Sequence, residues 1–351
     1  MNLLRPNIQT MPPYIPGEQP PIGSSVIKLN TNENPYPASP AALAVLRDLD
    51  PERLRRYSDP AATELRRAAA AVYGVDIDWI IAGNGSDDLL AMVVLACAGP
   101  GSKVAYAMPT YVLYRTLAQM VDAPIVEVPY DDDFNLPVDA LLAEQAAVTF
   151  VATPNSPSGT PAPIASLERL AAGLKGLLVI DEAYVDFAEA DAMPLVRRFE
   201  NVLVLRTLSK GYSLAGLRVG LGVGNPTLLE GLNKVKDSYN VGSIPAMMAA
   251  AALADQPYKN ACAARVKASR ARLSGELAGL GFRVWPSQSN FVLAQVPPGS
   301  QAKSLYMGLK ERGILIRYFN EPRLDDKLRI SVGTDEQNRA LTSALADLLK
   351  R

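Results

Sequence analysis

Short apolar runs alternate with longer helical stretches through the middle of the chain, from about residue 79 onward. The runs are WIIA (79–82), KVAYA (103–107), PIVEV (124–128), VTFVA (148–152), LLVID (177–181), VLVLR (202–206) and RVGLGV (218–223). This alternation is typical of parallel strands joined by crossover helices, and seven runs suffice for a complete α/β sheet. Between them, SDDLLAMVVLACAG and SLERLAAGLK predict helices, with Ser86 at the N-cap of the first.

The pattern changes after residue 225. Alanine-rich and charged helices are predicted over 226–281, followed by the strand-like runs FRVWP, NFVLAQV, ILIRYF and KLRISVG and by a closing helix. Helices and strands in separate blocks indicate a second, α+β domain. We therefore predict a large domain over 29–240, in which a mainly parallel seven-stranded sheet forms three α/β/α layers, and a smaller α+β domain over 241–351.

The first residues are rich in proline, which favours an extended arm over a packed element. We assign residues 1–28 to this arm. We expect it to pack against the smaller domain and to lie across a neighbour.

Composition narrows the class of protein. The chain has 351 residues, of which 48% are apolar and 20% charged, and its formal net charge is −1. A nucleic-acid partner would need a clustered basic excess, and the sequence has none. No N-terminal leader and no apolar run long enough for a bilayer occur, so we expect a cytoplasmic protein without a membrane partner. Cys97 and Cys262 lie far apart, which favours buried thiols over a disulfide framework or a zinc site.

The chain contains no histidine. This excludes the Ser-His-Asp and Cys-His nucleophile arrangements, HExxH metalloproteases and the usual transition-metal ligands, and we expect no metal site. Proton transfer must then depend on Lys, Asp, Glu, Tyr or a cofactor.

Polar residues gather where the predicted strands end. Ligands of open parallel sheets bind outside the carboxyl ends of the strands, so the residues that follow each run are candidates for one site. They are GNGSD (83–87), PTY (109–111), TPN (153–155), DEAY (181–184) and TLSK (207–210). These side chains have no evident structural role, and the sequence therefore predicts a single site at this edge.

Gly83 and Gly85, between a strand and a helix, could be half of a dinucleotide fingerprint. Asp88 replaces the third glycine and Lys103 stands where a ribose-binding acid is needed, which disfavours a nicotinamide cofactor. The helix N-terminus still offers backbone N–H groups and a hydroxyl to one phosphate group. A plain helix cap is the simpler interpretation of this segment.

Asp181 ends a strand that should be buried on both faces, where an unpaired carboxylate is costly. An ion pair with Lys210 would explain both residues. A heteroaromatic cofactor would instead use them separately, the lysine as a Schiff base and the acid as partner of a pyridinium nitrogen. Thr207, Ser209 and Arg218 would then surround the cofactor phosphate, because an arginine can hold it in a bidentate fork.

Nine segments, in consistent order nearly end to end, carry a family resemblance. They are LNTNENPYP (29–37), RYSDP (56–60), GNGSDD (83–88), MPTY (108–111), TPNSPSG (153–159), IDEAYVDF (180–187), TLSKGYSLAGLRVG (207–220), SNF (289–291) and LRISVGT (328–334). Together they resemble the pyridoxal-phosphate-dependent aminotransferases of fold type I, and most of all the histidinol-phosphate aminotransferase branch. Ser156 stands where that branch often has Asn, and Ser58 where it often has Pro. Neither position takes part in the chemistry, so these differences bear on the branch more than on the reaction.

The resemblance implies a role for each residue at the sheet edge. Lys210 would bind the aldehyde of pyridoxal 5′-phosphate and move a proton between the substrate α-carbon and the cofactor. Asp181 would keep the pyridine nitrogen protonated. Asn155 and Tyr184 would hydrogen-bond the phenolic oxygen of the cofactor, and Tyr111 would stack on its ring, although a tyrosine at a strand end can equally belong to the core.

The same resemblance implies a phosphate site and a partner subunit. The residues implied around the phosphate are Gly85, Ser86, Asp87, Thr207, Ser209 and Arg218. In this family a tyrosine that matches Tyr57 reaches the phosphate from the other subunit, which implies a homodimer with shared active sites.

Substrate contacts are implied for two arginines and for the N-terminal segment. Arg317 and Arg329 match arginines of the family's small domain, and two arginines suit a substrate that carries a phosphate or a carboxylate. Tyr14 and Asn32 lie in the segment that closes over the substrate in relatives.

We expect a transaminase that works in two half-reactions. By resemblance it interconverts L-histidinol phosphate and 2-oxoglutarate with imidazole-acetol phosphate and L-glutamate, a step of L-histidine biosynthesis. The alternatives are an aromatic amino acid aminotransferase, whose arginines would bind a carboxylate, and a decarboxylase of a phosphorylated amino acid. A binding module without turnover is disfavoured, because mere binding does not require Lys210 and Asp181 together.

Overall fold

A seven-stranded sheet is the centre of the computed structural model, which describes residues 3–12, 17–21 and 23–350. Its strands are β2 (Ile80–Gly83), β3 (Val104–Met108), β4 (Ile125–Pro129), β5 (Val148–Ala152), β6 (Leu177–Asp181), β7 (Val202–Thr207) and β8 (Gly220–Gly224). The strand order is β2-β8-β7-β6-β5-β3-β4, and β8 is antiparallel to both of its neighbours while the other pairs are parallel. All seven apolar runs therefore form strands, and the prediction of a mainly parallel sheet is confirmed.

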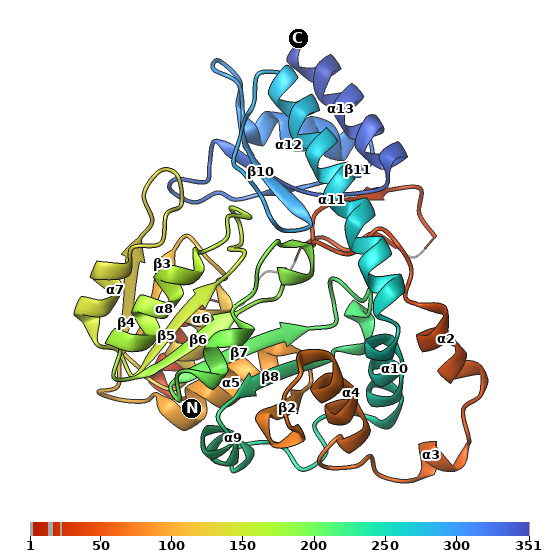
Figure 1. Cartoon of the computed structure of the whole chain (residues 1–351). Helices are drawn as coiled ribbons and strands as arrows, with labels where there is room; N and C mark the ends of the chain where they lie inside the picture. The colour runs from red at the N-terminus through yellow and green to blue at the C-terminus, as the bar shows by residue number, and fades with distance from the viewer. Residues whose placement is uncertain (1–2, 13–16, 22, 351) are drawn as a thin grey trace.

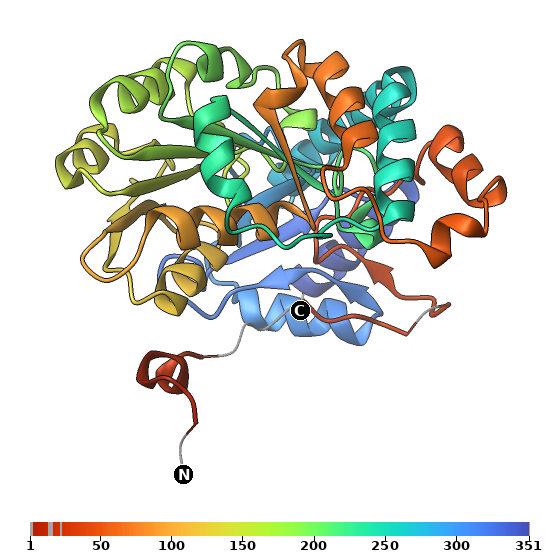
Figure 2. The same ribbon diagram turned by 90° about the horizontal axis from the view of Figure 1, so that it is seen from below.

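Helices cover both faces of this sheet and complete three layers (Figure 2). One face carries α4 (Thr63–Tyr73), α7 (Val138–Glu144), α8 (Ile164–Gly173) and α10 (Ser243–Ala254), and the other α5 (Ser86–Cys97), α6 (Leu113–Met120) and α9 (Pro226–Asn233). Each face has its own hydrophobic core. Along β6, Leu178 and Ile180 pack under the first group of helices, whereas Leu177 and Val179 pack under the second. Burial on both faces explains why these strands read as unbroken apolar runs.

The last third of the chain builds a second, antiparallel sheet (Figure 1). Its strands, in the order β12-β13-β10-β9, are β9 (Arg283–Val284), β10 (Phe291–Gln295), β12 (Arg317–Tyr318) and β13 (Lys327–Ser331). It is accompanied by α11 (Gln256–Gly279), α12 (Ala302–Glu311) and α13 (Asp335–Leu349). The smaller α+β domain is thus confirmed as a fold, and the long α11 leads into it from the large domain.

The later part of the N-terminal segment, at Glu18 and at Ile27–Lys28, is attached to this smaller domain. Strand β1 (Ile27–Lys28) pairs in parallel with β11 (Ile314–Leu315), and Lys310 forms an ion pair with Glu18 at 2.7 Å. Helix α10 packs against α2 (Pro40–Arg47) and α4 of the large domain. The exact boundaries after residues 28 and 240 stay a prediction.

The N-terminal arm is not extended throughout, contrary to expectation. Helix α1 (Pro6–Thr10) forms there because proline at the first helical position already has the required φ angle. Arg5 and Asn7 donate to the carbonyls of Met120 (2.7 Å) and Gln119 (2.9 Å) at the end of α6. The start of the arm therefore lies against the large domain.

The remaining helices are short. They are α3 (Glu52–Arg55) and the 3-10 turns η1 (Ile77–Trp79), η2 (Val185–Phe187), η3 (Met193–Arg197) and η4 (Ala215–Leu217). Within the described ranges, no helix has both the length and the apolar composition needed to cross a bilayer.

Candidate active site

The polar residues predicted at the sheet edge lie close together in the structure. Thr110 donates a hydrogen bond from its hydroxyl to Asn155 Oδ1 (2.8 Å), which links the ends of β3 and β5. Tyr111 donates to Asp87 Oδ1 (3.1 Å), and Arg218 pairs with Asp87 Oδ2 (3.0 Å). These contacts join segments that follow β2, β3, β5 and β7, so the predicted convergence at the carboxyl ends is present.

Asp181, the last residue of β6, is buried at the centre of this edge. The Tyr114 hydroxyl donates to its Oδ2 (2.7 Å), and the backbone N–H of Ala183 donates to its Oδ1 (3.2 Å). Burial raises the pKa of Asp181 to about 6; the charge of Asp87 also raises it, while these hydrogen bonds lower it.

The simple ion pair between Asp181 and Lys210 does not form. Among the residues that the structure describes, no lysine or arginine lies within ion-pair distance of the Asp181 carboxylate. The two residues therefore keep separate contacts, as the cofactor interpretation expects and the ion-pair alternative does not.

Lys210 follows β7, and its amine is directed toward the N-terminal segment. Its Nζ donates to the carbonyl of Thr31 (3.1 Å) and lies 5.9 Å from the centre of the Tyr184 ring. Burial, and then the positive charge of Arg329, lower the pKa of Lys210 to about 8. An amine with a depressed pKa is partly neutral near neutral pH and can attack a carbonyl.

The N-terminus of α5 forms a compact cradle at the end of β2. Gly85, not Ser86, is the N-cap residue, and Ser86 is the first helical residue; the prediction for Ser86 was wrong because Gly85 has a left-handed φ of 84°. Within the described chain, no side chain caps this helix end, so its first N–H groups remain available to a ligand. A Cβ on Gly220 would come within 2.4 Å of the Ser86 nitrogen, so β8 packs directly against the cradle.

Hydroxyl and guanidinium groups complete this cradle. The hydroxyls of Thr207 and Ser209 are buried and hydrogen-bond each other (3.0 Å), and Arg218 donates to Ser209 Oγ (3.4 Å). Arg218 itself has a left-handed φ of 52° and contacts Gly85 so closely that a Cβ there would lie 2.7 Å from its Nη2. Backbone N–H groups, hydroxyls and an arginine together form a donor set suited to one phosphate group.

Asn32 and Tyr184 form the side of the site that faces the N-terminal segment. Asn32 Nδ2 donates to the Tyr184 hydroxyl (3.0 Å), and the Asn32 backbone, at a left-handed φ of 57°, donates to Ser331 Oγ (2.9 Å). The Tyr184 ring packs edge-on against Phe291 at 5.0 Å. Burial raises the pKa of Tyr184, so its hydroxyl keeps a proton to donate.

Arg329 connects the small sheet to the large domain. It donates to Ser156 Oγ (3.1 Å) and to the carbonyl of Asn30 (3.0 Å). Arg317 is its direct partner across the antiparallel pair of β12 and β13, and the ring of Phe319 lies near both guanidinium groups, at 5.3 and 5.5 Å. Both substrate candidates therefore occupy one face at the domain junction; Tyr14 lies outside the described residues.

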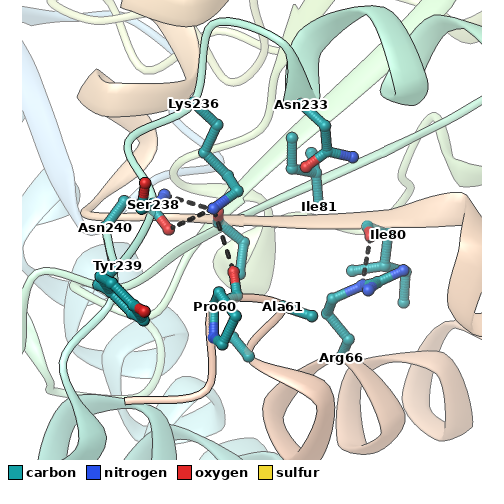
Figure 3. A pocket seen from close by; sticks show the side chains of 12 residues that line it. Pro60, Ala61, Arg66, Ile80, Ile81, Asn233, Lys236, Ser238, Tyr239 and Asn240 are labelled. Carbon is teal, nitrogen blue, oxygen red and sulfur yellow. Dashed lines mark hydrogen bonds between the residues drawn. The ribbon is translucent and has the colours of Figure 1, made fainter. Parts of the chain in front are cut away.

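Tyr57 is an exposed residue that follows α3. Its side chain is 83% exposed, and its ring stacks on Tyr239 at 4.6 Å with 17° between the planes. Beside Tyr239 lies a cavity of about 520 Å³, which Lys236 borders through its hydrogen bond to the carbonyl of Pro60 (3.1 Å) (Figure 3). Within the described chain, Tyr57 makes no hydrogen bond or ring contact with the other candidate site residues.

The sequence interpretation missed contributors to this site. Tyr114 was detectable, because it follows Tyr111 by three residues and that spacing places both on one side of a helical turn. Thr31 acts through its backbone carbonyl, which no residue pattern reveals. Asn34 donates to the carbonyl of Lys210 (2.9 Å) and holds that residue's backbone.

Comparison with known proteins defines the class. The family model "Aminotransferase class I and II" matches residues 24–345. The crystal structure of a histidinol-phosphate aminotransferase from Sinorhizobium meliloti in complex with pyridoxal-5′-phosphate has a TM-score of 0.91 and 29% identity, covering 100% of this chain and 98% of that one. The fold is that of the class I and II aminotransferases.

Curated relatives narrow the class further. Histidinol-phosphate aminotransferase 1 of Trichormus variabilis is 60% identical over 349 residues, which cover 99% of each chain. The histidinol-phosphate aminotransferase of Citrifermentans bemidjiense is 44% identical over 348 residues, again 99% of each. The chain belongs to the histidinol-phosphate aminotransferase family.

The cofactor of this family is pyridoxal 5′-phosphate, and the residues fit it. The Asp181 carboxylate is buried and has no basic partner among the described side chains, so it can accept a hydrogen bond from a protonated ring nitrogen. The cradle at Ser86 can accept the phosphate, and the Lys210 amine is nucleophilic enough to bind the aldehyde.

The close packing at Gly220 predicts a selective loss of cofactor binding. In Gly220→Ala, the added methyl would push on Gly85 and Ser86, and we expect affinity for pyridoxal phosphate to fall by about tenfold. Gly216→Ala is the matched control, because a Cβ there meets no atom within 4 Å. Titration of the cofactor-free proteins measures both, and equal affinities would contradict the cradle.

The lowered pKa of Lys210 predicts an unusual reactivity profile. Above about pH 8 the amine is mostly neutral, so its rate of reductive methylation in cofactor-free protein should reach half its maximum near pH 8. Mass spectrometry of the peptides follows the rate, with exposed Lys303 as the internal reference. A midpoint near the ordinary lysine value of 10.5 would show that the surroundings do not depress the pKa.

Proposed function

We propose that this chain is a histidinol-phosphate transaminase. It interconverts L-histidinol phosphate and 2-oxoglutarate with imidazole-acetol phosphate and L-glutamate in two half-reactions, as a step of L-histidine biosynthesis. The observation that carries this proposal is that Lys210 and Asp181 lie in one buried site but keep separate partners. Arg329 of the small domain contacts Ser156 of the large domain beside them. Identity of 60% over the whole chain to a curated relative of that name supports the substrate assignment.

Bound pyridoxal phosphate supplies an aldehyde that carries the amino group and a ring that accepts electrons from the substrate α-carbon. Lys210 would hold the cofactor through its Nζ, and its free amine would take the proton from the substrate α-carbon and return it during amino transfer. Asp181 would hold a proton on the ring nitrogen, which increases the capacity of the ring to accept electrons. Tyr184 and Asn155 would donate hydrogen bonds to the phenolic oxygen of the ring. Asn155 would give up one of its present acceptors for this, the Pro109 carbonyl (3.2 Å) or Ser158 Oγ (3.0 Å).

Tyr111 and the cradle hold the cofactor in place. Tyr111 lies edge-on to Tyr114 at 5.7 Å, and its hydroxyl bond to Asp87 fixes the plane that it presents to the ring. The phosphate would be held by the residues of the cradle, which are Gly85, Ser86, Asp87, Thr207, Ser209 and Arg218. Since Arg218 is already paired with Asp87, its charge is oriented before the phosphate arrives.

The substrate anion is held from the small domain. Arg329 and Arg317 face the same side of their sheet, and their paired charges favour a substrate phosphate in one half-reaction and carboxylates in the other. Asn32 would contact the bound substrate, and the same role for Tyr14, which lies outside the described residues, stays a prediction.

A half-reaction titration tests the assignment. Holoenzyme without a keto acid should change the absorbance of its bound cofactor at far lower concentrations of L-histidinol phosphate than of phenylalanine, because the arginines bind the phosphate. A preference for phenylalanine would assign the chain to the aromatic aminotransferases, and release of carbon dioxide from a phosphorylated amino acid would identify a decarboxylase.

A lysine variant tests the mechanism. Lys210→Ala should fold but should not catalyse amino transfer, whereas the control Lys303→Ala, at an exposed lysine, should retain activity. Full activity of Lys210→Ala would refute the mechanism.

We propose further that the enzyme is a homodimer in which Tyr57 reaches the phosphate site of the partner subunit. An aromatic side chain that is 83% exposed is unusual for a monomer, and Leu54 and Tyr239 beside it are exposed as well.

Mixing two inactive variants tests this sharing of sites. Lys210→Ala and Tyr57→Ala each damage every site of their own dimers. A hybrid dimer would contain one intact site, so exchange of subunits should restore about a quarter of wild-type activity if the two chains assort at random. If Tyr57 serves its own chain, the mixture gains no activity.

A further inference from the structure

Tyr114 has no role in the mechanism above, yet it is fully buried against the centre of the site. Its hydroxyl lies 2.7 Å from Asp181 Oδ2. Among the described residues, it is the side chain that donates a hydrogen bond to Asp181, and the other donor is the backbone N–H of Ala183. Helix α6, which carries Tyr114, covers the sheet face toward which Asp181 points, the face of Leu177 and Val179.

The ring of Tyr114 is fixed by aromatic neighbours. Phe150 of β5 stacks on it at 4.7 Å with 8° between the planes, and Tyr106 of β3 lies at 5.9 Å. Tyr111, which would stack on the cofactor, packs edge-on against it at 5.7 Å. Such contacts remove rotational freedom, so the hydroxyl is aimed at the carboxylate before any ligand binds.

The next carboxylate along the chain provides an internal comparison. Glu182 is equally buried, but it has a cationic neighbour: Arg206 lies 2.7 Å from Glu182 and 3.3 Å from Asp191. The side-chain partner of Asp181 is the Tyr114 phenol, whereas that of Glu182 is the Arg206 guanidinium. A neutral donor stabilises a carboxylate without cancelling its charge, so the charge of Asp181 remains for a cationic ligand.

We propose that Tyr114 is a positioning residue that keeps the Asp181 carboxylate ionised and oriented to receive the protonated ring nitrogen of the cofactor. This inference rests on the proposed function and deepens it. The other groups that face Asp181 are Asp87 from α5 and Tyr184 after β6, and neither supplies a positive charge. Tyr114 thus offsets part of the cost of burying this carboxylate.

Removal of the hydroxyl should change how cofactor binding depends on pH. Burial already raises the pKa of Asp181 to about 6, and loss of the Tyr114 hydrogen bond should raise it further, by about one unit. The protonated acid must lose its proton before it can pair with a ring cation. Affinity should therefore begin to fall below about pH 7 in Tyr114→Phe, but only below about pH 6 in the wild type.

The experiment is a titration of full-length, cofactor-free protein with pyridoxal 5′-phosphate between pH 5 and pH 8. The ratio of dissociation constants, Tyr114→Phe over wild type, should be about tenfold at pH 5 and near one at pH 8. Tyr106→Phe is the matched control: it removes a hydroxyl from the same aromatic cluster, but that hydroxyl bonds Glu127 (2.6 Å), and its profile should follow the wild type. Tyr114→Phe retains the ring and its packing, and near-ultraviolet circular dichroism checks that it folds.

Each outcome decides one question. A ratio that is the same at every pH overturns the role of Tyr114, whether the ratio is one or larger, because a merely structural residue would weaken binding uniformly. A shift of the same size in Tyr106→Phe also overturns it. Failure of the wild type to bind pyridoxal phosphate at pH 8 would instead refute the proposed function.

Discussion

Burial of both faces of the seven-stranded sheet is the constraint on which this structure depends. It leaves the strand interiors to apolar side chains and confines polar chemistry to the carboxyl edge. Buried hydroxyls occur in the strands as well, at Thr149 and Thr207, but the consecutive residues Asp181 and Glu182 bring two carboxylates into that buried region. Both accept hydrogen bonds, but Glu182 has Arg206 beside it, whereas Asp181 has no cationic partner among the described residues, and this difference creates a place for a cation.

The second half of the site comes from outside the large sheet. The N-terminal segment contributes the Thr31 carbonyl to Lys210 and the Asn32 amide to Tyr184, and the small domain contributes Arg329. Arg329 has two effects there, since it contacts Ser156 and its charge lowers the pKa of Lys210. Together with burial, the position of the small domain therefore influences the pKa of the Lys210 amine.

The phosphate cradle also depends on a close approach between the backbone of β8 and the N-terminus of α5. Gly85 and Gly220 leave no room for side chains, and Arg218 adopts a left-handed conformation beside them. A rarely populated backbone conformation in a larger residue is maintained only when its surroundings demand it. Here the surroundings are the ion pair with Asp87 and the hydrogen bond to Ser209, which orient the guanidinium toward the open end of α5.

The sequence by itself determined the seven strands, the α/β class and the edge where the site lies, because apolar periodicity and strand ends are local signals. Tertiary structure decided the partners. Tyr114 meets Asp181 across 67 positions and Arg329 meets Ser156 across 173, and local patterns do not encode such distant contacts. The same reason explains why Gly85 rather than Ser86 caps α5: its backbone angle is set by packing against β8.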